Sequence, residues 1–270
     1  MATVRAPYRS GSAAEFVDRL QSRGRYGFAV RELVQASGLS TAAAGAQLKR
    51  LHPRVKSLYP KSGFYVVVPP EHQANGAPPA SWWIDDFFTY HNEPYYIALL
   101  SAAAHWGVSH QAAQLTQVMT VTPRRAFTLG RVKISFLSKK ALGKTPVVTA
   151  TGGQTPFKVS TPEATVLDLL RYLKQSGGLP RVLQILNDLA SQLRTVEFRK
   201  ALKAHPEVTL VQRTGFILEA LGHQTLSRCA AEALSGQRLH PIPLSSGTPT
   251  DAPFHAAWGV YGVLPMEADA

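Results

Sequence analysis

A short turn between two helical segments constrains the start of this chain more than any other feature. Two amphipathic patterns, with Leu33 inward on the first and Leu48 inward on the second, flank the tetrapeptide SGLS at residues 37–40. Gly38 can adopt the left-handed conformation that ends a helix, and Ser40 can cap the helix that follows. A turn this short predicts a helix-turn-helix.

The second of these helices has a small and basic outer face. A helical projection places Ala44, Leu48 and Leu51 on the inner stripe. The opposite face carries Ala42, Ala46, Lys49 and Arg50. Small side chains let a helix approach base edges, and cationic ones reach phosphate or guanine. The pattern favours a DNA-recognition helix; a protein-docking helix and a solvated face are the alternatives.

The sequence directly after this helix predicts a β-hairpin. Residues 55–68, VKSLYPKSGFYVVV, contain two β-like segments around the turn sequence PKSG. A hairpin in this position is a wing, in which Lys56 and Lys61 would lie beside the phosphate backbone and Tyr59 would pack or hydrogen-bond there. A further helix predicted over residues 13–22 completes a winged helix-turn-helix.

Composition indicates a globular chain with an anionic partner. The 270 residues are 45% hydrophobic, enough for two cores, and the formal charge of +12 favours nucleic acid or, as the alternative, an anionic membrane face. A single cysteine, Cys229, and an N-terminal segment without an apolar signal core indicate a cytoplasmic protein. Residues 94–123 lack charge, but their His and Gln side chains argue against a membrane span.

Prolines and glycines near residue 75 predict a domain boundary. Pro69-Pro70 and the tract NGAPP at residues 75–79 interrupt both helix and strand. We therefore expect a DNA-binding domain over residues 1–75 and a larger mixed domain over residues 76–270. Both are basic, with eleven Lys and Arg against four Asp and Glu in the first and eighteen against thirteen in the second.

The second region alternates strand-like and helical patterns, so the expected fold class is α+β. A buried helix is predicted over residues 95–107, and the sequence STPE at residues 160–163 reads as a capping box. Strands are expected at residues 117–121, 131–136, 147–150, 157–159 and 258–264. Helices are expected at residues 164–173, 180–193, 197–204 and 209–221.

Residues 94–162 contain eight cations and no carboxylate. Surfaces usually mix both signs, so the block suggests a second anion-facing surface in the larger domain. We assign to it Arg124, Arg125, Arg131, Lys133, Lys139, Lys140 and Lys144. The alternative is that these cations pair with acids elsewhere, such as Asp85, Asp86 or Asp168.

No catalytic or metal-binding constellation is recognisable, and no cofactor is predicted. The chain has no GxG, GxxxxGK[ST], HExxH, CxxC or GxSxG sequence, no Glu-x-Lys of a nuclease and no Asp-x-Asp of a nucleotidyltransferase. Asp85-Asp86 and the pair His105 and His110 are interpreted as structural residues. A DNA-targeted enzyme is therefore disfavoured.

Three phrases carry a resemblance to a known family. YYIALLSAAAHWGVSHQ at residues 95–111, STPEATVLDLLRY at residues 160–172 and SGGL at residues 176–179 resemble AbiEi-type antitoxins of type IV toxin–antitoxin systems. The resemblance spans residues 16–222. It departs at residues 212–216, QRTGF, where the family more often reads Arg-Leu-Gly-Tyr.

The resemblance implies a phage-defence antitoxin that also represses its own two-gene operon by binding inverted repeats in double-stranded DNA. By position it assigns Ser40, Thr41, Lys49 and Arg50 to the recognition helix and Lys61 to the wing. The C-terminal domain would carry the antitoxin activity against a nucleotidyltransferase toxin, without requiring a stable complex. The alternative function is a ligand-sensing winged-helix repressor that has no partner toxin.

Overall fold

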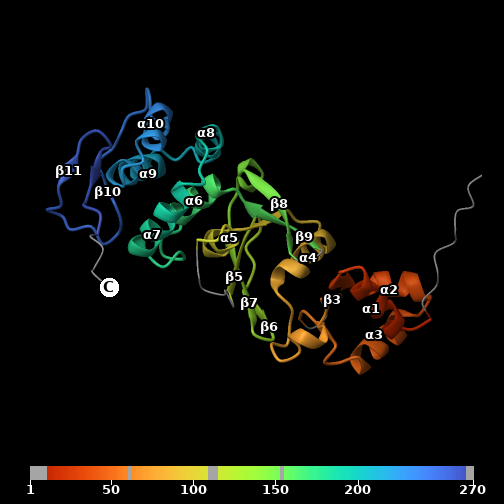
Figure 1. Ribbon diagram of the computed structural model, residues 1–270. Helices are drawn as coiled ribbons and strands as arrows, with labels where there is room; N and C mark the ends of the chain where they lie inside the picture. Colours follow the sequence, from red (N-terminus) through yellow and green to blue (C-terminus); the bar gives the residue numbers. More distant parts are fainter. Residues whose placement is uncertain (1–10, 60–61, 109–114, 153–154, 266–270) are drawn as a thin grey trace, which may run out of the picture. The chain divides into compact units, whose positions relative to one another are not determined.

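The computed structural model describes residues 11–59, 62–108, 115–152 and 155–265 (Figure 1). The chain forms two compact units of interleaved segments. Unit 1 comprises Met1–Tyr95, Gln114–Ser138 and Thr149–Lys158, and unit 2 comprises Tyr96–Ala113, Lys139–Val148 and Val159–Ala270. Helices and several sheets are present, which confirms the α+β class. None of the helices in the described ranges is long and apolar enough to span a membrane.

Unit 1 begins with three helices and three short strands. In chain order they are α1 (Ala13–Ser22), β1 (Gly27–Ala29), α2 (Val30–Ser37), α3 (Thr41–Arg50), β2 (Val55–Ser57) and β3 (Phe64–Val67). The strands form an antiparallel sheet in the order β1-β3-β2, with Lys56 opposite Val66 and Phe28 opposite Tyr65. The hairpin predicted after α3 is therefore present.

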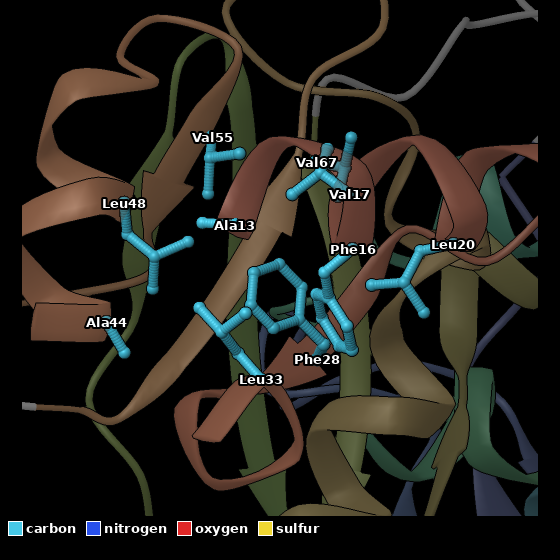
Figure 2. Close-up of a cluster of buried hydrophobic side chains, with 10 residues drawn as sticks. All are labelled: Ala13, Phe16, Val17, Leu20, Phe28, Leu33, Ala44, Leu48, Val55 and Val67. Atoms are coloured by element: carbon cyan, nitrogen blue, oxygen red, sulfur yellow. The ribbon is translucent and has the colours of Figure 1, made fainter. Parts of the chain in front are cut away.

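One apolar cluster joins these elements, with side chains from all three helices and all three strands converging on it (Figure 2). Phe16 of α1 meets Phe28 of β1 edge to face, with ring centroids 5.3 Å apart. Leu33 of α2 and Leu48 of α3 are almost fully buried against them. Each large apolar side chain contributes about 1.5–3 kcal/mol on burial, so this cluster fixes how α2 and α3 pack.

The rest of unit 1 is built on aromatic packing. It contains η1 (Pro70–His72), η2 (Ala80–Trp82), α4 (Ile84–His91), β5 (Leu115–Thr120), β6 (Phe127–Leu129) and β7 (Val132–Ser138). Strand β7 pairs parallel with β5 and antiparallel with β6. Phe87 of α4 contacts both Phe64 of β3 and Phe127 of β6. The sequence patterns did not predict β6, which is three residues long.

The predicted boundary near residue 75 falls inside unit 1. The carbonyl of Asn75 accepts a hydrogen bond from the backbone N–H of Arg131 at 2.7 Å. Gly76 and Gly130 approach so closely that a β-carbon on Gly130 would lie 2.2 Å from that carbonyl oxygen. The Pro- and Gly-rich tract is therefore packed against the β6–β7 turn instead of acting as a free linker.

Unit 2 is mainly helical (Figure 1). Its helices are α5 (Leu99–His105), η3 (Leu142–Lys144), α6 (Pro162–Arg171), α7 (Leu179–Ala190), α8 (Thr195–Ala204), α9 (Val208–Ala220) and α10 (Gln224–Ala233). Strands β10 (Ile242–Pro243), β11 (Phe254–His255) and β12 (Val260–Tyr261) form a small sheet. Helix α10 was not predicted, because its stripe of Leu226, Cys229 and Ala230 is weakly apolar.

Three strands contribute residues to both units: β4 (Tyr95–Ile97), β8 (Val147–Gly152) and β9 (Thr155–Ser160). Within unit 2, Ile97 pairs parallel with Val159. The helix predicted from Tyr95 is wrong over its first residues, which form β4, and α5 begins at Leu99. Three consecutive large residues, Tyr95 to Ile97, are fully buried, a pattern that a strand and a helix share.

Helix α6 is buried on all sides, from Glu163 to Leu170. Thr161 caps it, because its hydroxyl accepts a hydrogen bond from the N–H of Ala164 at 3.3 Å. The predicted capping box of Ser160 and Glu163 is wrong: the cap is Thr161, and the carboxylate of Glu163 accepts from the backbone N–H of Arg194 at 3.0 Å. Glu163 therefore anchors the start of α8 to α6.

Candidate nucleic-acid interface

The turn between α2 and α3 has the predicted geometry. Gly38 has a φ of 74° and donates its N–H to the carbonyl of Val34 at 2.9 Å, which ends α2. The hydroxyl of Ser40 accepts from the N–H of Ala43 at 3.2 Å, which starts α3. Leu39, between them, is half-buried against the apolar cluster. The turn therefore holds α3 at a fixed angle to α2.

Helix α3 buries one face and exposes the other. Ala44 and Leu48 are 0% and 2% exposed. The residues predicted to contact DNA are all exposed on this helix or its cap: Ser40, Thr41, Ala42, Ala46, Lys49 and Arg50. Neither Lys49 nor Arg50 forms an ion pair with any residue in the described part of the chain. Their charges are therefore available to an anionic partner.

The side chains predicted to lie in the wing are partly engaged in packing. Lys56 is half-buried, and its Nζ lies 2.9 Å from where a β-carbon on Gly76 would be. Tyr59 is 36% exposed and rests on Phe127, with ring centroids 6.0 Å apart. Lys61 lies outside the described residues. Both described side chains therefore have packing roles inside unit 1 as well as exposed surface.

The seven cations assigned to a second basic surface divide between the units. Arg125, Arg131 and Lys133 are exposed in unit 1. Lys140 and Lys144 are exposed in unit 2. The remaining two form ion pairs: the Nε of Arg124 donates to Glu93 at 2.7 Å, and Lys139 pairs with Asp168. The alternative interpretation, neutralisation by acids elsewhere, therefore applies to Arg124 and Lys139.

The assignment of Lys139 to a surface is wrong. Its side chain is only 2% exposed, and its Nζ lies 2.9 Å from Oδ1 of Asp168, which is fully buried. A buried ammonium needs such a partner because burial favours its neutral form. Burial accordingly lowers the pKa of Lys139, while the charge and hydrogen bond of Asp168 act in the opposite direction.

Two further polar side chains complete this buried ionic cluster of Tyr96, Lys139, Asp168 and His205. The hydroxyl of Tyr96 donates to Oδ2 of Asp168 at 2.8 Å. The Nε2 of His205 lies 2.6 Å from Nζ of Lys139, and its Nδ1 lies 2.9 Å from the carbonyl of Ala201. The same Nε2 lies 3.1 Å from Oδ1 of Asp168, so the imidazole contacts both members of the ion pair.

Asp168 is ionised within this cluster. Burial opposes ionisation, but the hydrogen bond with His205 and the charge of Lys139 outweigh it and lower the pKa of the carboxyl group. This cluster was not predicted from the sequence, although an aspartate inside the apolar run VLDLL was a usable signal. A carboxylate on a helix that is buried all round requires a cationic partner.

The acidic pair at the start of α4 also has structural partners. Asp86 accepts from the Nε of Arg25 at 2.8 Å, and Arg25 donates in turn to Glu32 at 2.6 Å. Asp85 accepts from the hydroxyl of Tyr95 at 3.0 Å. Among the residues that the structure describes, no group of three or more His, Cys, Asp or Glu side chains could hold a metal ion. His110 lies outside those residues.

Residues 96–220, which contain the buried ionic cluster, match the family model of the AbiEi antitoxin C-terminal domain. They form an AbiEi antitoxin C-terminal domain. The family resemblance drawn from residues 95–111 and 160–172 is thereby confirmed, and the AbiEi assignment supports an antitoxin role in a toxin–antitoxin system. The matched AbiEi domain begins in β4 and ends with α9.

The fold of the whole chain has a counterpart among solved structures. The crystal structure of the RV2827C protein from Mycobacterium tuberculosis superposes with a TM-score of 0.64, covering 96% of this chain and 94% of that one. The sequences are 14% identical, so the similarity concerns the fold alone. No curated protein is similar enough to this chain to count as a match.

Proposed function

We propose that the protein is a cytoplasmic antitoxin of a type IV toxin–antitoxin system that represses its own operon. Unit 1 binds inverted repeats in the promoter, and the AbiEi domain antagonises a nucleotidyltransferase toxin without a stable complex. The observation that supports the DNA-binding half is the exposed basic face of α3, whose Lys49 and Arg50 form no ion pair with a described residue. The match to the AbiEi family model supports the antitoxin part of the proposal.

The order of elements in unit 1 supports a winged helix-turn-helix. Helices α2 and α3 are joined by a tight Gly38 turn, and the hairpin β2–β3 follows α3 directly. In such domains the second helix enters the major groove and the hairpin lies along the backbone. Lys49 and Arg50 then contact phosphate or guanine, and the small Ala42 and Ala46 let α3 approach the bases.

The exposed cations Arg125, Arg131 and Lys133 of the same unit provide further phosphate contacts in this proposal. They contribute affinity and not sequence preference, because phosphates carry no sequence information. Lys140 and Lys144 give the other unit a basic character of its own, which is available to DNA, RNA or toxin.

DNA binding is tested with a labelled fragment of the promoter upstream of the operon. Lys49→Ala with Arg50→Ala removes two charges from α3 and is expected to weaken binding more than tenfold, since one good base contact is worth about 1–3 kcal/mol. The matched control, Arg23→Ala with Lys174→Ala, removes two exposed charges elsewhere. Equal binding by both double variants would contradict the assignment of α3.

Antitoxicity is tested by co-expressing the full chain with the product of the neighbouring gene. A toxic neighbour whose effect the chain relieves supports the antitoxin assignment. The α3 double variant is expected to relieve toxicity while failing to repress the promoter, since α3 lies outside the matched residues 96–220. A harmless neighbour would instead favour the ligand-sensing repressor.

A further inference from the structure

Helices α8, α9 and α10 of unit 2 line an open cavity of about 400 Å³. This volume lies within the range of about 300–1,000 Å³ that is usual for small-molecule sites. Leu202 of α8, Val211 of α9 and Leu234 after α10 form apolar walls. The α10 residues Cys229 and Ala233, one helical turn apart, face the same space with small side chains. Helix α10 therefore leaves room that a larger residue would fill.

The cavity has one charged side. Arg199, Lys203 and Glu232 line this side, and the two cations lie one turn apart on α8. Arg199 donates through Nε at 3.1 Å and Nη2 at 2.9 Å to a single oxygen of Glu232, so the rest of its guanidinium fork is not used in that pair. Lys203 is exposed and has no ion pair with a described residue. The mouth therefore carries a net positive charge beside apolar walls.

The cysteine in the cavity does not supply reactivity. Cys229 is 2% exposed and its thiol donates to the carbonyl of Thr225 at 3.3 Å. Burial raises the pKa of the thiol, which keeps it protonated and unreactive at neutral pH. In this cavity Cys229 acts as a small apolar surface.

We propose that this cavity binds an apolar monocarboxylate, of the class of medium-chain fatty acids, with its chain against α9 and α10 and its carboxylate at Arg199 and Lys203. Apolar walls stabilise the chain through desolvation, and the two cations pair with the carboxylate through charge-assisted hydrogen bonds. Glu232 also lines the cavity, but Arg199 and Lys203 outnumber it, so the mouth favours an anionic head group over a cationic one. The site is separate from the α3 surface and does not depend on DNA binding.

The first test measures decanoate binding to the full-length protein by titration calorimetry, below the concentration at which decanoate forms micelles. Saturable binding of one decanoate per chain is expected. Ala233→Phe should weaken it at least tenfold by filling the cavity. Ala220→Phe, an equal change on the exposed end of α9, is the control and should bind as wild type. No saturable binding, or binding unchanged by Ala233→Phe at an unchanged Tm, would overturn the proposal.

The second test separates the charge from the apolar walls. Lys203→Gln should weaken decanoate several-fold and leave 1-decanol unaffected, because only decanoate carries the charge. Lys200→Gln, on the same helix and paired with Glu197, does not line the cavity and serves as control. If Lys203→Gln changes both ligands equally, or neither, the carboxylate assignment is wrong. The α3 double variant should bind decanoate as wild type, so this outcome is independent of the proposed DNA binding.

Discussion

The Nζ of Lys139 lies 2.9 Å from Oδ1 of Asp168, and both side chains are almost completely buried. Lys139 precedes η3 and Asp168 lies on α6, so the pair joins two segments of unit 2. A buried ion pair is tolerated only when further hydrogen bonds satisfy its remaining donors and acceptors. His205 and Tyr96 supply them, which makes the four side chains one interdependent unit.

Removing one member of this pair should destabilise unit 2 strongly. We expect Lys139→Met to lower the free energy of unfolding by about 3–5 kcal/mol, because the carboxylate of Asp168 is left buried without its cation. Lys140→Met, at the adjacent exposed position, should change it by less than about 0.5 kcal/mol. Urea denaturation followed by circular dichroism compares the two variants. Equal stabilities would show that the pair contributes nothing.

Asp86 should give unit 1 a pH-dependent stability. Burial raises its pKa to about 6, although the charge and hydrogen bond of Arg25 lower it. The unfolded carboxyl ionises near pH 4, so between about pH 4 and 6 the folded chain binds more protons, and the contribution of Asp86 to stability falls as pH rises. Across this titration, the free energy of unfolding decreases by an amount on the order of 2–3 kcal/mol.

Asp86→Asn isolates this effect, since the amide still offers an oxygen to Arg25 but does not titrate. The stability of the wild type relative to Asp86→Asn should decrease from about pH 4 and level off only above about pH 7, where the folded carboxyl is fully ionised. Chemical denaturation at a series of pH values measures the difference. A difference that increases with pH over this window would mean that pairing with Arg25 outweighs burial.

Two glycines close together in the chain should respond oppositely to alanine. Gly38 has a positive φ and open space around it, so Gly38→Ala should cost about 1–2 kcal/mol through backbone strain alone. Gly45, inside α3, also has open space but no positive φ, and Gly45→Ala should stabilise by about 0.5–1 kcal/mol. Differential scanning calorimetry measures both changes in stability. Changes of the same sign in the two variants would contradict the left-handed conformation of Gly38.

The affinity for promoter DNA should fall steeply with salt. Each phosphate contact contributes a slope of about −0.9 to log K against log salt concentration. If Lys49 and Arg50 both contact phosphate, their replacement by alanine should reduce the slope by about 2. Fluorescence anisotropy over a range of NaCl concentrations measures it. A weaker affinity with an unchanged slope would indicate that these two side chains contact bases alone.

Local elements were predicted well because their causes are local. The Gly38 turn, the Ser40 cap and the β2–β3 hairpin each depend on residues within a few positions of one another. Short or weakly patterned elements were not predicted: β6 has three residues, and α10 has a stripe of small side chains. The segment beginning at Tyr95 was ambiguous, since a buried run without polar positions fits both helix and strand.

The candidate site was predicted only where exposure followed from periodicity. On α3, burial of Ala44 and Leu48 requires Lys49 and Arg50 to point outward, and they do. The block of cations in residues 94–162 offered no such constraint, because no periodicity separates its exposed residues from its buried ones. Lys139 and Lys140 are adjacent in sequence, yet one is buried in an ion pair and the other is exposed.

The sequence by itself therefore determined helices α2 and α3, the turn between them and the basic face of α3, because spacing and capping act over one or two helical turns. Tertiary structure alone decided that Lys139 meets Asp168, that Asn75 packs against Arg131, and that α8, α9 and α10 leave a cavity. These features join residues far apart in the chain. Their free energies come from desolvation and close packing, which depend on the neighbours that folding brings together.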